Sequence, residues 1–198
     1  MATGISKTKW SGHEVNNQES SQMATLSYPN KLSEQQILAT PPGRYSILNQ
    51  VDNLSGRLFY DDNLPVLSFL RNDPTLFGKV QLVYIDPPYA TGSVFKSRKQ
   101  KDAYIDTLTG TEYLEFMRHR LIFLRELLSD DGSIYVHLDQ NMAFHVKVLL
   151  DEIFGPRNFR NLITRKKSNP KNYTRKTFGN ISDFILFYTK SATYVWNR

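Results

Sequence analysis

Apolar residues form two kinds of pattern along this chain. The stretch 80–85 (VQLVYI) is nearly all apolar, as is typical of a parallel strand covered on both faces. From Tyr113 to Leu128 the apolar positions recur at helical spacing, which predicts an amphipathic helix. The same reasoning predicts further helices at 32–38, 63–70 and 142–154 and further strands at 57–60, 133–138 and 183–189. Alternating strands and helices predict an α/β fold, with a mostly parallel sheet and helices on both faces.

The domain organisation follows from length and polarity. A chain of 198 residues is long enough for one domain with a hydrophobic core. Residues 1–27 are polar and without periodicity, so we expect a flexible tail there and a folded domain over 28–198. No apolar run approaches the roughly 20 residues of a membrane span, and no signal-peptide pattern is present. The sequence has no cysteine, which excludes disulfides and thiolate metal sites and fits a cytoplasmic protein.

Basic residues gather in the last quarter of the chain. The formal net charge is +6, and residues 153–182 contain no acid but eight bases. Interleaved aromatic and amide side chains suit phosphate contacts combined with base stacking, so we interpret 157–180 as a nucleic-acid-facing segment. A shorter basic block spans 96–101, and solvated surface explains either block alone about equally well. The candidate contacts are Lys96, Arg98, Lys99, Arg165, Lys166, Lys167, Lys171, Arg175 and Lys176.

The apolar stretch 80–85 runs directly into Asp86-Pro87-Pro88-Tyr89. Ligands of α/β sheets bind beyond the carboxyl ends of the strands, where this corner is expected. The prolines fix two φ angles and remove two N–H donors, which leaves the Asp86 carboxylate and nearby carbonyls as acceptors. Tyr89 adds a flat aromatic face. The corner therefore suits a planar ligand that carries an NH₂ group, although a simple strand-to-loop turn is the alternative.

The exocyclic amine of adenine or cytosine is such a group. It is a poor nucleophile because its lone pair is delocalised into the ring. Two acceptors on its N–H bonds localise the lone pair and stabilise the positive charge that develops as nitrogen attacks an electrophile. A base inside a duplex cannot reach such a pocket, so it must be flipped out and stacked, a role that suits Tyr89.

Several segments together resemble one enzyme family. VYIDPPYATG resembles motif IV of amino-group DNA methyltransferases that use S-adenosylmethionine (SAM), in the D-P-P-Y form typical of adenine-N6 enzymes. YDDNLPVLSFL and LLSDDGSIYVHLD are similar to the G-D-N-L-x-V-L and L-L-x-x-x-G-x-I-Y-V-H-x-D segments of the β-type branch. FGPRNFRNLITRKK and RKTFGNISDFILFYTKS are similar to later strands of type III and related modification enzymes. The resemblance runs from about residue 45 to the end and implies an incomplete Rossmann-like methyltransferase fold.

The resemblance also implies roles for the residues of the corner. Asp86 and the Pro87 carbonyl would accept hydrogen bonds from the target N6, Pro88 would shape the turn, and Tyr89 would stack on the flipped base. Asp86 would also lie near SAM, because methyl donor and acceptor must meet in line. No metal ion is needed for this transfer.

Other polar residues in the matching segments have weaker assignments. Asp62 and Asn63 are candidate cofactor contacts, but a helix N-cap explains them equally well. Asp61 stands where the family usually has glycine, so the conformation of that loop is open. Asp139 is better explained as a helix cap. His137 lies in an alternating strand, and we interpret it as structural rather than catalytic.

One element of the β-type pattern is absent. That branch carries the SAM-binding loop F-x-G-x-G towards the C-terminus, whereas the ten glycines here are isolated, the closest two being eight residues apart. The sequence ends at YVWNR, about where the recognition region is expected. Three explanations stay open: a truncated chain, one half of a split enzyme whose second polypeptide carries the glycine-rich loop, or a remnant that binds nucleic acid without catalysis.

The sequence thus predicts the N-terminal catalytic part of a restriction-modification DNA methyltransferase. We expect it to transfer a methyl group from SAM to N6 of an adenine flipped out of double-stranded DNA, by direct displacement. The alternatives are a catalytically inactive nucleic-acid-binding module and a cytosine-N4 methyltransferase.

Overall fold

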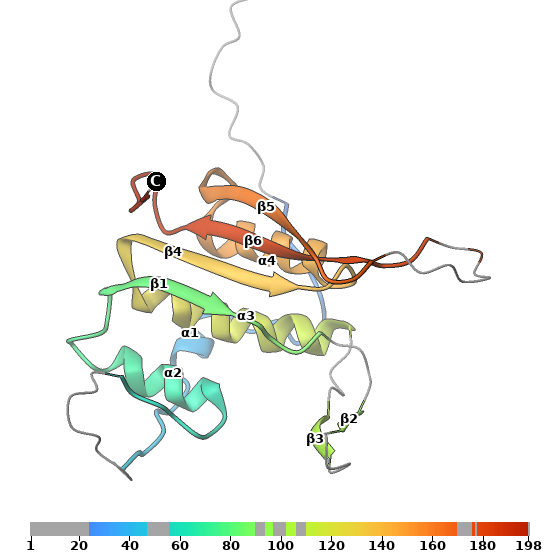
Figure 1. Cartoon of the computed structure of the whole chain (residues 1–198). Coiled ribbons are helices and arrows are strands. Elements are labelled where there is room, and N and C mark those ends of the chain that lie inside the picture. The colour runs from blue at the N-terminus through green and yellow to red at the C-terminus, as the bar shows by residue number, and fades with distance from the viewer. Residues whose placement is uncertain are drawn as a thin grey trace, which may run out of the picture.

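The computed structural model describes residues 24–46, 56–89, 94–96, 102–105, 110–169, 176 and 178–197, with the backbone alone at 94–96 and 102–105. Its helices are α1 (Glu34–Leu38), α2 (Asn63–Arg71), α3 (Gly110–Leu127), α4 (Ala143–Phe154) and the 3₁₀ helix η1 (Pro156–Asn158). Its strands are β1 (Val80–Ile85), β2 (Val94–Lys96), β3 (Asp102–Ile105), β4 (Leu128–Leu138), β5 (Phe159–Lys166) and β6 (Ser182–Thr189). Figure 1 shows these elements arranged around one main sheet, which confirms the α/β prediction.

The main sheet has the strand order β1-β4-β6-β5, and β2 and β3 form a separate antiparallel pair. β1 pairs with β4 in parallel, whereas β6 pairs antiparallel with both β4 and β5. β1, β4 and β5 therefore run in one direction. α4 connects β4 to β5, which lies two positions away in the sheet. The chain then turns back at the β5–β6 hairpin, and β6 takes the position between β4 and β5. The described sheet is therefore mixed rather than mostly parallel: three of its four strands run in one direction, but one of its three hydrogen-bonded pairs is parallel and two are antiparallel.

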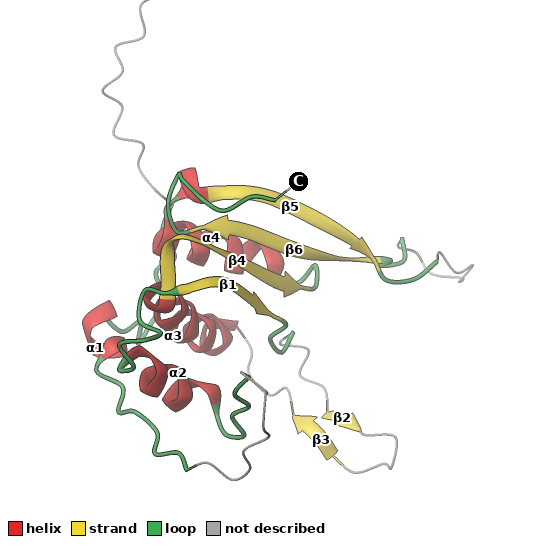
Figure 2. Ribbon diagram, turned by 60° about the vertical axis from the view of Figure 1, so that its left-hand side comes forward, coloured by secondary structure: helices red, strands yellow, loops and turns green. Residues whose placement is uncertain are grey.

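Helices cover one face of this sheet. α3 and α4 lie behind it in both views, and α2 packs against α3 (Figures 1 and 2). The β4 side chains that point towards these helices, Ile134, Val136 and Leu138, are fully buried. The prediction of helices on both faces is wrong for the described residues: the C-terminal segment crosses the opposite face, where Trp196 stacks on Phe187 with ring centroids 6.1 Å apart.

Short-range signals set several helix starts. Ser33 caps α1 and Asp62 caps α2, each through a side-chain oxygen that accepts a backbone N–H. Asp139 accepts the N–H groups of Asn141 and Met142 just before α4. These local bonds satisfy donors that a helix leaves unpaired at its start, and those of Asp62 and Asp139 agree with the cap roles considered from the sequence.

β4 begins directly after α3, earlier than the predicted residue 133. Its pairing with β1 shifts register between Val80 and Leu82. Gly132 lies in this irregular stretch, where an added Cβ would stand 2.9 Å from the Val80 and Ser129 carbonyl oxygens and from a Leu128 methyl group. Such an approach is too close for any side chain, so the shift in register requires glycine here.

The predicted strand at 57–60 is wrong, because these residues form an irregular segment ahead of α2. Leu58 and Tyr60 within it are almost fully exposed, whereas Phe59 packs on Tyr45 and Phe69. Of the expected tail, residues 1–23 lie outside the described part, and the Leu26 N–H donates to Glu152 of α4. None of the described helices is both long and apolar enough to cross a membrane.

Candidate active site

Asp86 lies at the carboxyl end of β1, where the sequence placed it. Its side chain is 57% exposed. The Tyr89 hydroxyl donates to Asp86 Oδ1 at 2.7 Å, and His137 Nδ1 lies 3.3 Å from the same oxygen. Asp86 Oδ2 has no hydrogen-bond partner among the described residues. Within the described part of the chain, the carboxylate therefore has one occupied oxygen and one open oxygen.

Tyr89 is fixed to this corner by its own hydroxyl. Its ring stands edge-on to His137, with centroids 5.9 Å apart and planes at 76°. Burial raises the pKa of the Tyr89 phenol, and the hydrogen bond to Asp86 raises it further; the charges of Asp86, Asp183 and Asp139 act in the same direction. Tyr89 is therefore a neutral phenol, bonded to Asp86, across the physiological pH range.

An open cavity of about 380 Å³ lies beside the corner, between β1, α2 and α3. Its wall is mostly apolar, with a few convergent polar groups, the usual make-up of a small-molecule site. Tyr89 is not part of this wall and packs instead towards His137, so that Asp86 separates two environments. The lining residues are Asn63, Leu67, Tyr84, Ile85, Asp86, Pro87, Pro88, Phe116, Met117, Arg120 and Leu124.

Arg120 connects α3 to the two predicted cofactor residues. Its Nε donates to Asn63 Oδ1 at 2.5 Å, and its Nη2 lies 3.2 Å from Asp62 Oδ1. The guanidinium also lies over the Phe116 ring, 3.4 Å from the centroid. Asp62 caps α2, as the alternative explanation held, while Asn63 lines the cavity together with Asp86. Arg120 itself is 7% exposed, and sequence reasoning missed it because an arginine on an amphipathic helix is usually at the surface.

Comparison with known proteins finds a match over the part of the chain that contains this corner. The model of the DNA methylase family (N6_N4_Mtase) matches residues 80–198, which is more than half of the chain and includes the Asp86–Tyr89 corner. The chain belongs to the DNA methylase family. This confirms the resemblance drawn from the D-P-P-Y segment and the segments that follow it.

Two curated relatives and one solved structure give the extent of the likeness. Type II methyltransferase M.EcaI of Enterobacter cloacae is 45% identical over 184 residues, covering 88% of this chain and 39% of that protein. Type III restriction-modification enzyme StyLTI Mod subunit of Salmonella typhimurium is 29% identical over 178 residues, 77% of this chain and 26% of that protein. The crystal structure of the M1.HpyAVI–SAM complex overlaps 71% of this chain and 57% of that one, with 18% identity and a TM-score of 0.46. This methylase chain thus spans about two fifths of M.EcaI.

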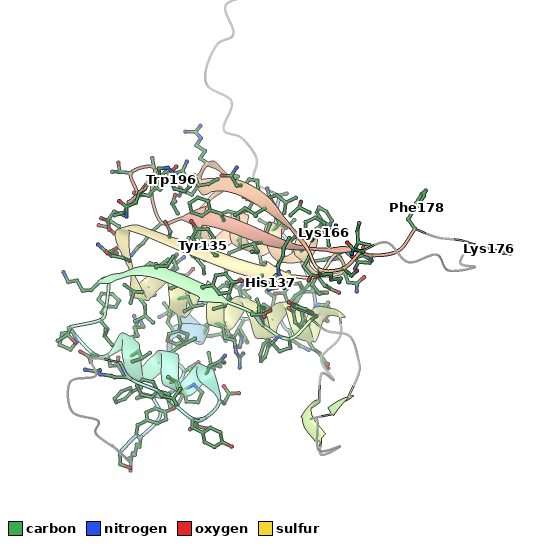
Figure 3. All side chains as sticks on the ribbon, viewed as in Figure 1. Tyr135, His137, Lys166, Lys176, Phe178 and Trp196 are labelled. Atoms are coloured by element: carbon green, nitrogen blue, oxygen red, sulfur yellow. The ribbon has the colours of Figure 1, made fainter. Side chains whose placement is uncertain are left out.

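The basic segment of this methylase is partly described. Arg165 and Lys166 end β5, and Figure 3 shows Lys166 near the start of the β5–β6 hairpin, with Lys176 and Phe178 at its far end. Phe178 is fully exposed. The remaining predicted contacts, Arg98, Lys99, Lys171 and Arg175, lie outside the described residues, and for Lys96 on β2 the backbone alone is described.

Two of these cationic side chains form ion pairs with a carboxylate of the same chain. Lys167 Nζ lies 2.8 Å from Asp183 Oδ1, and Arg165 Nη1 lies 3.4 Å from Asp183 Oδ2. Asp183 is buried on β6, directly opposite Arg165 across the β5–β6 pair. Lys166 makes no ion pair with the described residues and is exposed. The segment therefore presents fewer free charges than its sequence suggests. Within the described part of the chain, no group of three His, Asp or Glu side chains is placed to hold a metal ion.

Sequence reasoning also missed the residues behind Asp86. His137 was interpreted as structural, yet the fold places its ring against both Asp86 and Tyr89. Asp183 was not singled out at all. The signal that could have found them is the alternation of β4 and β6, which places His137 and Asp183 on the face of the sheet that Asp86 shares.

Proposed function

We propose that this chain is the base-binding part of a SAM-dependent DNA methyltransferase that methylates adenine at N6, within a restriction-modification system. The observation that carries the proposal is the half-open Asp86 carboxylate, exposed at the carboxyl end of β1 and bordering a 380 Å³ cavity. A carboxylate that served only a turn would not need an open cavity beside it.

The chemistry follows from the acceptors at the corner. A flipped adenine places its amine against Asp86 Oδ2 and the Pro87 carbonyl, each of which accepts one N–H. These two acceptors make the nitrogen more tetrahedral and localise its lone pair, which prepares it to accept the methyl group that bound SAM would supply. The carboxylate stabilises the positive charge on nitrogen until one N–H proton leaves to solvent. Proximity and these fixed acceptors supply most of the rate.

The cavity residues fit a cofactor of the SAM type. Its apolar wall suits an adenosyl group, and the Asn63 amide and the Arg120 guanidinium are polar groups that can hold its amino-acid end. When bound, SAM supplies an electrophilic methyl group on a sulfonium. Asn63 would orient it, and Asp86 would lie between it and the base. Asp62 would not contact the cofactor itself, but it caps α2 and pairs with Arg120.

The proposal includes partners of two kinds. Double-stranded DNA is the substrate, contacted by the β5–β6 hairpin and flipped onto Tyr89. A second polypeptide, or a further part of a longer chain, supplies the F-x-G-x-G loop, because the sequence contains no such pattern. The cytoplasm, where bacterial restriction-modification acts on DNA, is the proposed location.

The test is methyl transfer from labelled SAM to DNA, with this chain alone and with an added polypeptide that carries the glycine-rich loop. Asp86→Asn keeps the side-chain shape but replaces one acceptor oxygen with a donor. We expect it to lower kcat by about 100-fold or more, the usual loss when a charge-stabilising group is removed. Asp130→Asn is the matched control, because the Asp130 side chain is 98% exposed and far along β4 from the corner.

The outcomes separate the proposed enzyme from its alternatives. Normal methylation by Asp86→Asn would show that the corner is not the reacting site. Salt-dependent DNA binding without heat of SAM binding in calorimetry, with or without the added polypeptide, would favour an inactive binding module. Nucleoside analysis of the product distinguishes N6-methyladenine from N4-methylcytosine.

A further inference from the structure

The His137 ring lies between two carboxylates. Its Nδ1 is 3.3 Å from Asp86 Oδ1, and its Nε2 is 3.7 Å from Asp183 Oδ2. The side chain is 8% exposed, although it projects from the face of the sheet that carries no described helix. Nε2 is buried without a hydrogen-bond partner among the described residues. Figure 3 shows His137 near the end of β4, beside the corner after β1.

The proton inventory of this cluster restricts the roles of the two ring nitrogens. Tyr89 has a single hydroxyl proton, and it is given to Asp86 Oδ1 at 2.7 Å. Nδ1 faces that same oxygen and lies 3.4 Å from the Tyr89 oxygen, so it needs a proton of its own to avoid facing two lone-pair acceptors. Nε2 faces the carboxylate of Asp183 alone. A proton on Nδ1 satisfies the approach to Asp86, whereas Nε2, 3.7 Å from Asp183 Oδ2, lies beyond hydrogen-bond distance.

Asp183 is itself held in place. It is 4% exposed, and Lys167 and Arg165 reach it from β5 at 2.8 and 3.4 Å. A buried carboxylate is tolerated only when it is paired in this way. The groups that face the ring are thus Asp86 and Tyr89 after β1 and Asp183 on β6, with the two β5 cations behind Asp183. Asp183 thus holds the ring on its Nε2 side, and the ring in turn holds Asp86 on its Nδ1 side.

We propose that His137 is a positioning residue for Asp86, anchored by Asp183. The inference rests on the proposed function, which it deepens. Tyr89 donates to Asp86 Oδ1 and His137 Nδ1 lies 3.3 Å from the same oxygen, so the two groups hold the carboxylate with Oδ2 turned to the amine of the flipped base. Fixing acceptors before the charge develops is what makes them effective in the transition state. Removal of His137 frees the carboxylate without removing any group that touches substrate.

Two amide substitutions separate the two ends of the ring. Asparagine at position 137 keeps a donor close to the place of Nδ1, and glutamine keeps one close to the place of Nε2. In the methyl-transfer assay we expect His137→Gln to lower kcat by about 10- to 100-fold, the scale of a mispositioned reacting group, with the KM for DNA unchanged. His137→Asn should recover most of that loss. His145→Gln, in an exposed residue of α4, is the control.

A second readout does not depend on activity. The ¹⁵N shifts of the His137 ring in the 198-residue chain report which nitrogens carry protons, with His137→Gln used to assign the signals. We expect a proton on Nδ1 in the parent chain and a change of its signal in Asp86→Asn, because Nδ1 faces Asp86 Oδ1. A neutral ring with Nδ1 unprotonated would overturn the proposal, as would equal kcat values for the asparagine and glutamine variants. If the parent chain transfers no methyl group under any condition, the proposed function fails, and the ring spectra alone decide whether His137 holds Asp86.

Discussion

The two faces of the main sheet differ in what they bury. The face under α3 and α4 is apolar and closed: Ile134, Val136 and Leu138 of β4 have no exposed surface. On the opposite face, Leu82 and Tyr84 of β1 are 62% and 57% exposed. Hydrophobic burial therefore fixes the fold from one side of the sheet. The other side is left with room for groups that face a ligand.

The polar residues of the second face are also organised differently from surface charges. Asp86, His137 and Asp183 come from three adjacent strands and lie in one line, with His137 and Asp183 buried although no described helix covers them. Burying polar groups costs free energy unless they are paired, so this face carries a constraint that packing alone does not explain. The comparison teaches that the face under α3 and α4 provides stability, whereas the Asp86–His137–Asp183 cluster lies on the other face, and the cavity beside Asp86 opens at the β1 edge next to α2 and α3.

The largest effect is expected from a matched pair of side-chain truncations, one on each face of the sheet. Leu138→Ala removes a fully buried side chain from the closed face, and we expect a loss of about 2–5 kcal/mol in the free energy of unfolding. Leu82→Ala removes the same atoms from a 62% exposed position, with an expected loss below about 1 kcal/mol. Urea unfolding of both variants measures the two values. Equal losses would mean that the open face is covered in solution.

Next in size is the contribution of Tyr89 on the open face. Tyr89→Ala removes the ring proposed to stack on the flipped base, a contact worth about 1–3 kcal/mol, or roughly 5- to 150-fold in kcat/KM. Tyr89→Phe keeps the ring and loses the hydroxyl that donates to Asp86, so its effect should be smaller. Kinetics of both variants, with fluorescence of 2-aminopurine at the target position, separates stacking from hydrogen bonding. An alanine variant that flips and methylates normally would assign the stacking to another side chain.

Much of the closed face was predictable from sequence. Apolar residues at helical spacing from Tyr113 to Leu128, and the apolar strands, predicted which residues are buried in the core. This works because burial repeats with the period of the helix or strand. The position of Asp86 was also predictable, because a strand that ends in two prolines must end in a corner. The apolar pattern did not predict β5, because Leu162 and Ile163 stand alone between polar and basic residues, and the resemblance of FGPRNFRNLITRKK to a later strand of the family was the one signal for it.

The open face was not predictable in the same way. The apolar 80–85 stretch suggested a strand covered on both sides, and sequence periodicity does not say where a covering layer is absent. His137 and Asp183 are 46 residues apart, and their meeting depends on β6 pairing between β4 and β5. Arg120 lies among the buried residues of α3. Its contacts with Asp62 and Asn63 exist because the start of α2 packs beside it, which the sequence of α3 does not show. Contacts of this kind depend on tertiary pairing rather than on local pattern.

A smaller effect concerns the charges at the edge of the open face. Lys166 is exposed and has no ion-pair partner among the described residues, whereas Lys167 is held by Asp183 at 2.8 Å. If Lys166 contacts a phosphate, Lys166→Ala should lower the slope of log binding constant against log salt by about 0.9. Lys79→Ala, an exposed lysine just before β1, is the control and should leave the slope unchanged. A slope that falls for Lys167→Ala but not for Lys166→Ala would mean that DNA displaces Asp183 from Lys167.

The smallest expected effect compares a tyrosine on each face under alkaline conditions. Tyr188 on the closed face donates to Asp151 Oδ1 at 2.7 Å, and Tyr89 on the open face donates to Asp86 at the same distance. Burial raises the pKa of both phenols above the ordinary value of 10.0, and the carboxylate partners raise it further. Below pH 10 both states of the chain keep these protons, so the stabilisation is complete there. As the pH rises above 10 the unfolded chain loses protons that the folded chain retains, and stability falls.

Replacing each phenol by phenylalanine tests which face contributes more to this alkaline loss. Tyr188→Phe and Tyr89→Phe should each make the free energy of unfolding fall less steeply between about pH 9 and pH 11, since one titrating group is gone from both states. We expect the larger change for Tyr188, which has no exposed surface, because its phenol is further from the solvent that would stabilise an anion. Urea unfolding across this pH range, with the parent chain measured beside each variant, gives the slopes directly. A larger change for Tyr89 would show that the line of carboxylates on the open face acts on its phenol more strongly than burial acts on Tyr188.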